Sequence, residues 1–167
     1  VLRAAKARGA TTSLDTVWDA TGSWMATLGP CLEHTQIFLP SLAEAQEITG
    51  RQNPADVTDA LLDLGVEVIG LKMGPEGSYV ATQDERVSVP AYTIDAVDGT
   101  GAGDAYVAGF LSARLDGWDL ERTARFANAV GALCTTGLGT TAGVRSREGT
   151  LEWLEQREPG AWGDIRG

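Results

Sequence analysis

The chain has 167 residues, 43% of them hydrophobic and 22% charged, which is ordinary for a globular protein and enough for one domain with one core. A formal net charge of -10 and a pI near 4.4 exclude the basic surface that nucleic acids or anionic membranes require as partners. Two cysteines, no leader-like opening and no apolar run of the ~20 residues that span a bilayer predict a soluble, cytoplasmic protein.

The first elements alternate between helix and strand. VLRAAKARG, at residues 1–9, reads as the second half of a helix that ends at Gly9, so the chain is expected to belong to a longer protein. Strand-like runs follow at 10–15 (ATTSLD) and 36–40 (QIFLP). Each of these strands leads into polar residues.

Two helices are marked by their capping residues. Ser41 and Glu44 have the spacing of a capping box, which predicts a helix in SLAEAQEITG. Asn53 and Pro54 suit the N-cap and the first position of a second helix, and Gly65 suits its end.

The second half of the chain continues this alternation. VEVIGLKM is almost continuously apolar, as in a strand buried on both faces, and the turn GPEG follows it. Further strands are expected at 78–83 and 86–92, and further helices at 102–117 and 120–137. The pattern predicts an α/β layered fold, a largely parallel sheet flanked by helices, with ligands at the carboxyl ends of the strands.

The stretch AVDGTGAGDAYVAGF, residues 96–110, lies where a strand ends and a helix begins. Its glycines leave backbone N–H groups bare at the positive end of the helix dipole, which is an arrangement that binds anions. Asp104 places a carboxylate beside them in the first turn. This combination suits phosphoryl transfer to an alcohol, with the N–H groups stabilising the phosphate and Asp104 accepting the hydroxyl proton.

Other interpretations of this stretch are weaker. A single Gly-Asp pair is more often a turn and a cap, but three alternating glycines before one aspartate favour a functional loop. The dinucleotide fingerprint G-x-G-x-x-G fails because Asp104 or Tyr106 occupies the third glycine position. The phosphate-loop pattern fails because no Gly-Lys-Ser/Thr follows.

The motif DGTGAGDAYVAGF closely resembles the C-terminal signature of the ribokinase-like (PfkB-type) carbohydrate kinases. In the same order as in that family, LPSLAEAQEITG is similar to the Asn-x-x-Glu segment, LKMGPEG to the nucleotide loop, and ANAVGAL to the helix that bears an asparagine near the adenine. The resemblance covers nearly the whole chain. It implies that residues 1–167 are the nucleotide-binding and catalytic portion of a sugar kinase whose N-terminal half is absent, so that the fold is incomplete.

The resemblance also implies roles for individual residues. Asp104 would be the catalytic base and contact the sugar, Gly101, Ala102 and Gly103 would form the anion hole for the γ-phosphate, and Asp15 would bind the sugar. Residues on the side of ATP would be Ser41, Glu44, Lys72, Gly74, Gly77 and Asn128. Glu44 would also hold Mg²⁺ indirectly, and Asp98 and Thr100, with Cys134 and Gly139, would form a monovalent-cation site.

Some of these residues have a plain structural alternative. Ser41 and Glu44 could serve only as a capping box, and residues 72–77 could be only a hairpin turn. Asn128 could simply face solvent from an apolar helix.

The chain also departs from the family pattern. Ser41 replaces the family's asparagine, Gly99 replaces its usual hydroxyl residue, and Val17 and Asp19 stand where many sugar kinases have Asn and Arg. These departures leave the identity of the sugar open.

The sequence therefore predicts an ATP-dependent and Mg²⁺-dependent kinase that phosphorylates a hydroxyl group of a sugar or sugar acid, with a monovalent cation as a further ligand and a homodimer as a compatible assembly. A sensor of sugar or nucleotide that keeps this fold without turnover is the alternative, and a dinucleotide oxidoreductase is a weaker one. His34 is expected at the surface, and the tail REPGAWGDIRG is expected to be a loosely ordered surface segment.

Overall fold

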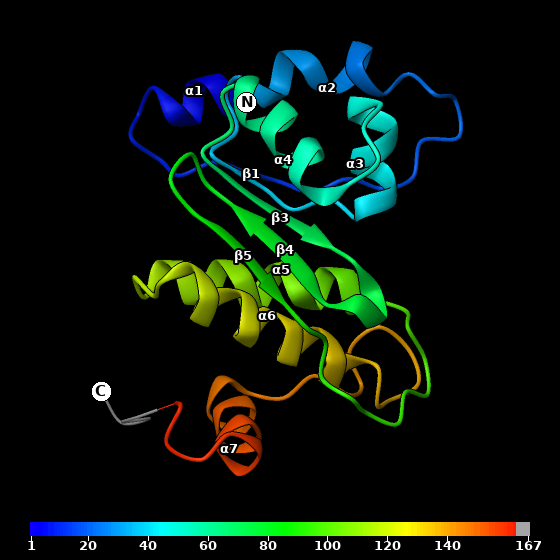
Figure 1. Ribbon diagram of the computed structural model, residues 1–167, viewed down its shortest axis with the longest axis vertical. Helices are drawn as coiled ribbons and strands as arrows, with labels where there is room; N and C mark the ends of the chain where they lie inside the picture. Colours follow the sequence, from blue (N-terminus) through cyan, green and yellow to red (C-terminus); the bar gives the residue numbers. More distant parts are fainter. Residues whose placement is uncertain (163–167) are drawn as a thin grey trace. The chain divides into compact units, whose positions relative to one another are not determined.

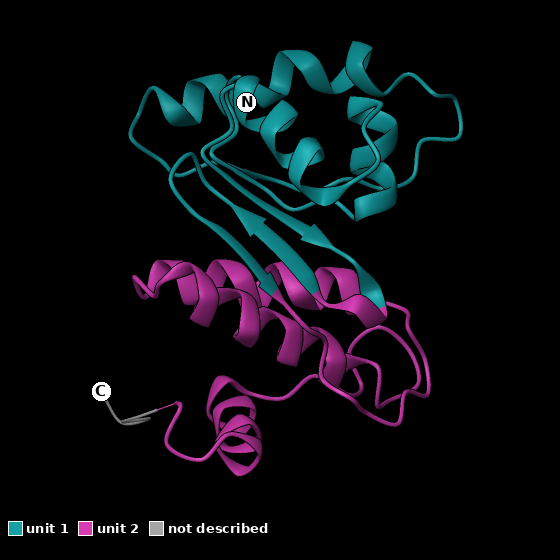
Figure 2. Ribbon diagram, viewed as in Figure 1, with its two compact units in different colours: residues 1–74, 78–88 teal, residues 75–77, 89–167 magenta. Residues whose placement is uncertain are grey.

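The structure is a computed structural model that describes residues 1–162. It divides into two compact units, coloured in Figure 2: unit 1 comprises residues 1–74 and 78–88, and unit 2 comprises residues 75–77 and 89–167. Each unit has its own cluster of buried hydrophobic side chains, where the length of the chain predicts a single core.

Unit 1 carries most of the predicted alternation of helices and strands. Its elements are α1 (Leu2–Lys6), β1 (Ser13–Leu14), α2 (Trp24–Leu32), β2 (Ile37–Phe38), α3 (Leu42–Thr49), α4 (Pro54–Asp63), β3 (Val68–Lys72) and β4 (Ser78–Ala81). The last strand, β5 (Arg86–Val89), runs from unit 1 into unit 2. The capping residues of α3 and α4 are those that the sequence predicts, Ser41 and Asn53.

The sheet has the strand order β1-β2-β3-β4-β5 (Figure 1). β1, β2 and β3 pair in parallel, whereas β4 runs antiparallel to β3, with Lys72 opposite Ser78. The prediction of a largely parallel sheet is therefore confirmed for the first three strands, and the hairpin makes the sheet mixed. Because β1, β2 and β3 are parallel, their carboxyl ends meet at one edge of the sheet.

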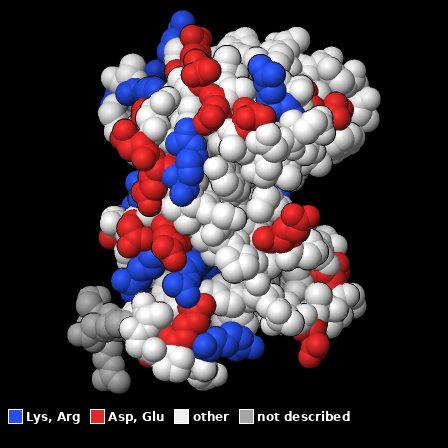
Figure 3. Space-filling view, viewed as in Figure 1, with Lys and Arg blue, Asp and Glu red and all other residues white. Residues whose placement is uncertain are grey.

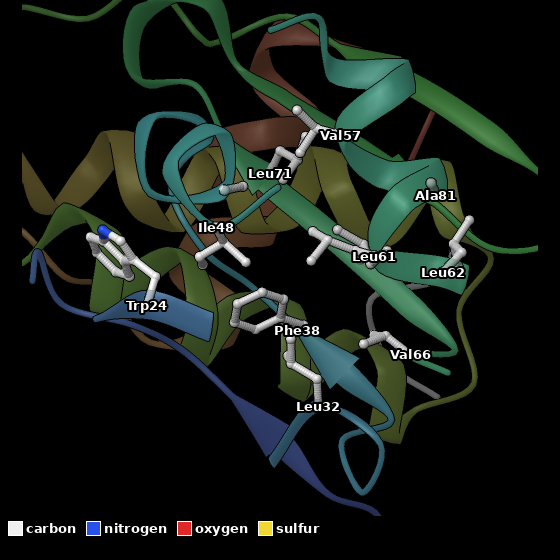
Figure 4. Packing of buried hydrophobic residues seen from close by; sticks show 12 residues of the cluster. Trp24, Leu32, Phe38, Ile48, Val57, Leu61, Leu62, Val66, Leu71 and Ala81 are labelled. Atoms are coloured by element: carbon white, nitrogen blue, oxygen red, sulfur yellow. The ribbon is translucent and has the colours of Figure 1, made fainter. Parts of the chain in front are cut away.

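Helix α2 was not predicted from the sequence. Gly29 and Pro30 lie in its second half, and both residues weaken a helical pattern. Trp24 and Leu32, two turns apart, are nevertheless buried. They belong to the hydrophobic cluster of unit 1, which Figure 4 shows around Phe38.

Unit 2 contains three long helices: α5 (Ala102–Leu115), α6 (Leu120–Cys134) and α7 (Arg147–Arg157). α5 and α6 begin where the sequence predicts, and they lie side by side (Figure 1). The expectation of a loose surface tail is wrong for its first part, because Trp162 is only 1% exposed and packs with Trp118 and Phe126. The rest of that tail, residues 163–167, lies outside the described residues.

The face of the molecule in Figure 3 carries acidic and basic side chains interspersed, rather than one basic area. Within residues 1–162, the helices are too short or too polar to cross a bilayer.

A half-buried phenol in unit 2 gives a prediction about alkaline pH. Tyr92 donates a hydrogen bond to Glu158, with its oxygen 3.2 Å from Oε1, and burial, followed by the negative charge of Glu158, raises the pKa of Tyr92 to about 12. Because the unfolded phenol titrates near pH 10, the stability that this group contributes is present below about pH 10 and is lost as the pH rises toward about 12. Ultraviolet titration of the folded protein should show a late phenolate step that Tyr92→Phe removes; a Tyr92 phenolate forming near pH 10 would contradict this.

Candidate functional site

The glycine-rich loop predicted to bind an anion forms a sharp turn at the start of α5. Gly101 is the N-cap of α5 and has a φ of 82°, in the left-handed region that side chains rarely adopt. A Cβ atom on Gly101 would lie 2.5 Å from the carbonyl oxygen of Thr140. Both the backbone conformation and the approach of Thr140 therefore require glycine at this position.

Three backbone N–H groups at this turn are without an acceptor in the part of the chain that the structure describes: those of Gly101, Gly103 and Asp104. The N–H of Ala102 donates instead to Gly99, at 3.2 Å. Gly103 is helical rather than left-handed, and Asp104 is exposed in the first turn of α5. The free donors thus differ by one residue from the predicted set of Gly101, Ala102 and Gly103. We call Gly101–Asp104 the cradle.

Asp98 holds the loop that leads into the cradle. Its Oδ1 accepts hydrogen bonds from the backbone N–H and the hydroxyl of Thr100, at 2.9 and 2.7 Å, and its Oδ2 accepts one from the N–H of Gly139, at 2.9 Å. The Thr100 hydroxyl, followed by these N–H donors, lowers the pKa of Asp98 below its usual value. The structure therefore brings together the residues predicted for a monovalent-cation site, while that role stays a prediction.

Cys134 joins the two loops that flank Gly101. Its buried Sγ lies 3.2 Å from the carbonyl oxygen of Thr140 and 3.8 Å from that of Thr100. Burial, followed by the negative charges of Asp98 and Asp104, raises the pKa of the Cys134 thiol. The thiol therefore stays protonated and acts as a donor to the loops.

In unit 1, polar residues gather where the three parallel strands end. Asp15 and Thr16 follow β1, Ser41 follows β2, and Lys72 ends β3. The Nζ atom of Lys72 lies 2.7 and 2.6 Å from Oδ1 and Oδ2 of Asp15, an ion pair that the sequence analysis did not foresee. An Asp and a Lys at the carboxyl ends of two strands of the same predicted parallel sheet were the available signal.

Glu44 connects to the same residues. Its Oε2 accepts hydrogen bonds from the N–H and the hydroxyl of Ser41, at 2.8 and 2.7 Å, and from the hydroxyl of Thr16, at 3.1 Å. The capping-box interpretation of Ser41 and Glu44 is confirmed, and Glu44 is buried, with 8% of it exposed. Asp15, Thr16, Ser41, Glu44 and Lys72 are called the strand-end network below.

The turn predicted as a nucleotide loop lies between β3 and β4. Gly74 begins the short 3₁₀ helix η1 (Gly74–Glu76), and Gly77 has a φ of 96°. A Cβ atom on Gly77 would lie 2.0 Å from the carbonyl oxygen of Val89, so chain packing by itself requires this glycine. The hairpin interpretation is confirmed as geometry, and contact with a nucleotide stays a prediction.

Asn128 is buried in α6 rather than facing solvent. It is 7% exposed, and its Nδ2 donates to the carbonyl oxygens of Val89 and Pro90, at 3.2 and 3.1 Å. The solvent-facing alternative is therefore wrong, and the amide positions the chain that follows β5. Its predicted place near an adenine is a separate, untested prediction.

Metal ions have no ready-made site of side chains in residues 1–162, where no three His, Cys, Asp or Glu residues converge. Glu44 in the strand-end network fits a divalent ion that keeps most of its water and phosphate ligands, as Mg²⁺ commonly does. The indirect role of Glu44 at Mg²⁺ stays a prediction.

Comparisons with known proteins show what the chain is similar to in sequence and in fold. Residues 1–147 match the model of the pfkB family carbohydrate kinase. The chain is 29% identical over 139 residues to a 2-dehydro-3-deoxygluconokinase of Bacillus subtilis, covering 83% of this chain and 43% of the relative.

Two solved structures share the fold. An E. coli protein assigned as ribokinase II, in complex with ATP and Mg²⁺, superposes with a TM-score of 0.85 and 27% identity, covering 93% of this chain and 52% of that one. A Vibrio cholerae fructokinase double mutant with fructose, ADP and potassium superposes with a TM-score of 0.80 and 26% identity, covering 92% and 53%. The chain thus spans about half the length of the proteins that it matches.

Proposed function

Because this chain belongs to the pfkB family of carbohydrate kinases, we propose that the complete protein transfers the γ-phosphoryl group of ATP to a hydroxyl group of a sugar or sugar acid. The observation that carries the proposal is the cradle: bare N–H groups at a turn that only glycine can form, with the Asp104 carboxylate one residue beyond Gly103. The ATP and Mg²⁺ bound to the E. coli relative, and the sugar substrates in the relatives' names, support it.

The residues of unit 2 perform the chemical step in this proposal. Asp104 accepts the proton of the attacking hydroxyl, which makes the oxygen a better nucleophile. The N–H groups of the cradle donate to the oxygens of the transferred phosphoryl group, where negative charge is concentrated. Gly101 and Gly103 act through their backbone, while Asp98, Thr100 and Cys134 hold the turn in shape.

The residues of unit 1 hold the nucleotide side. Lys72 offers a positive charge to a phosphate oxygen, and Glu44 with Ser41 holds the water shell of Mg²⁺. Mg²⁺, when bound, neutralises charge on the β- and γ-phosphates. Gly74 of unit 1, with Gly77 and Asn128 of unit 2, shapes the backbone near the nucleotide. The family resemblance assigns Asp15 to the sugar.

A sensor without turnover is the second candidate, because Ser41 and Glu44 satisfy each other's hydrogen bonds. Asp104 favours the kinase, since a protein that only binds ligands has no use for an exposed carboxylate beside an anion site.

Ligand preference tests this proposal. ATP with Mg²⁺ should raise the melting temperature of the complete protein and NAD should not, because only a ligand that prefers the native state stabilises it. A coupled assay with a panel of sugars and sugar acids should then detect formation of ADP. Stabilisation by NAD, with no effect of ATP and Mg²⁺, would contradict the kinase, and stabilisation by ATP without turnover of any sugar would favour the sensor.

A further inference from the structure

The ion pair between Asp15 and Lys72 joins strands that are not neighbours. Asp15 follows β1 and Lys72 ends β3, while β2 lies between these two strands and pairs with both. The lysine side chain therefore reaches over the end of β2, where the backbone of Lys72 also donates to Pro40, at 3.0 Å. The pair lies at the edge of the sheet where ligands bind in folds of this class.

Stability alone does not explain such a pair. The two side chains are 15% and 25% exposed, so both charges have lost much of their hydration. Desolvation of a partly buried ion pair offsets most of its attraction, and apolar residues of similar size serve stability about as well. An ion pair that adds so little stability is better explained by what it positions, which here is the ammonium group of Lys72.

Asp15 leaves Lys72 able to bind a second acceptor. An ammonium group has three N–H donors, and Asp15 accepts two of them through its two carboxylate oxygens. Asp15 is itself fixed by the N–H of Thr16, 2.8 Å from Oδ1, and the Thr16 hydroxyl bonds to Glu44. The lysine is thus held at the strand end with one donor left for an anionic oxygen.

We infer that Asp15 is a positioning residue for Lys72: it fixes the ammonium group at the carboxyl end of β3, so that Lys72 meets a nucleotide phosphate without first losing its side-chain freedom. This inference rests on the proposed kinase function and gives Asp15 a role on the side of the nucleotide rather than as a sugar contact. Immobilising a free lysine side chain weakens an equilibrium by on the order of tenfold, which sets the size of the effect.

Calorimetric titration of the complete protein with ATP and Mg²⁺ tests the inference without knowledge of the sugar. Asp15→Asn should bind ATP with Mg²⁺ about tenfold more weakly, and Lys72→Met at least as weakly. The double variant should bind no more weakly than Lys72→Met alone, because Asp15 acts through Lys72. Asp15→Glu, which keeps the charge, should recover part of the affinity.

Two controls separate positioning from charge and from folding. Asp15→Asn removes a negative charge, which by itself would strengthen the binding of anionic ATP. Titrations at about 0.5 M salt screen this Coulombic effect. Asp59→Asn breaks another ion pair of unit 1, with Arg86 at 2.6 Å, and should leave ATP affinity unchanged. Melting curves identify any variant that fails to fold. If Asp15→Asn fails to fold, the double variant, which has no unpaired lysine, is compared with Lys72→Met instead. That comparison still shows whether Asp15 affects ATP binding.

The possible outcomes distinguish a failure of the role of Asp15 from a failure of the kinase proposal. Additive losses in the double variant, or Asp15→Asn binding as tightly as the unchanged protein or more tightly at high salt, would overturn the role of Asp15 and leave the kinase proposal standing. A complete protein that binds no ATP with Mg²⁺ would overturn the kinase proposal and this inference together.

Discussion

Asp104→Asn should lower sugar phosphorylation by the complete protein about 10²-fold or more, within the usual contribution of a general base, while ATP binding is retained. The amide has nearly the shape of the carboxylate but cannot accept the hydroxyl proton. Because Asp104 is exposed in the first turn of α5, no packing is lost. Steady-state kinetics and ATP titrations on the same preparation measure both effects.

The matched control is Asp119→Asn. Asp119 is the N-cap of α6, where its side chain accepts the N–H of Arg122 at 2.7 Å, and asparagine is an equally good cap. This variant loses the same charge at the start of a neighbouring helix and should keep normal turnover. Near-normal turnover in Asp104→Asn as well would show that Asp104 is not the base.

The second large effect is expected at Gly101. Gly101→Ala should reduce kcat by about 10²- to 10³-fold, the range found when a donor to a developing oxyanion is lost. The added Cβ would lie 2.5 Å from the Thr140 carbonyl oxygen, so the turn must move. Its N–H groups would then no longer point at the transferred phosphoryl group. The left-handed φ of 82° adds strain of roughly 1–2 kcal/mol to any residue with a side chain.

Gly117→Ala is the control for Gly101→Ala, because it introduces similar backbone strain away from the candidate site. Gly117 has a similar φ of 75°, but a Cβ there meets no atom within 4 Å, and the residue only follows the end of α5. It should lose roughly 1–2 kcal/mol of stability with kcat nearly unchanged. If Gly101→Ala also loses only stability in thermal melts and keeps its kcat, the loop is a simple turn and the cradle has no part in catalysis.

Much of this fold could be predicted because its signals are local. The capping residues Ser41 and Asn53, the apolar run of β3 and the glycine-rich start of α5 each depend on a few neighbouring residues. The helix α2 was missed because Pro30 and Gly29 mask its pattern, and the packing of Trp162 was missed because its partners, Trp118 and Phe126, lie more than thirty residues away in the sequence.

The candidate site likewise has features that a local motif predicts and features that depend on the folded structure. Gly101 and Asp104 could be selected from one short motif. The structure adds that the close approach of Thr140 leaves no room for a side chain at Gly101. The free N–H of Asp104, the bonded N–H of Ala102 and the pairing of Asp15 with Lys72 depend on backbone geometry or on distant residues. No pattern of residue types carries that information.

The strand-end network also bears on how unit 1 folds. The hairpin of β3 and β4 joins residues close in sequence, so it can close within microseconds. The contact of Asp15 with Lys72 joins residues 57 positions apart and needs β1, β2 and β3 to be in register first. Closing long loops is entropically costly, and contacts of this kind slow folding. The segment that carries Lys72 should therefore acquire its structure early, and its charge should reach its working position among the last events of folding.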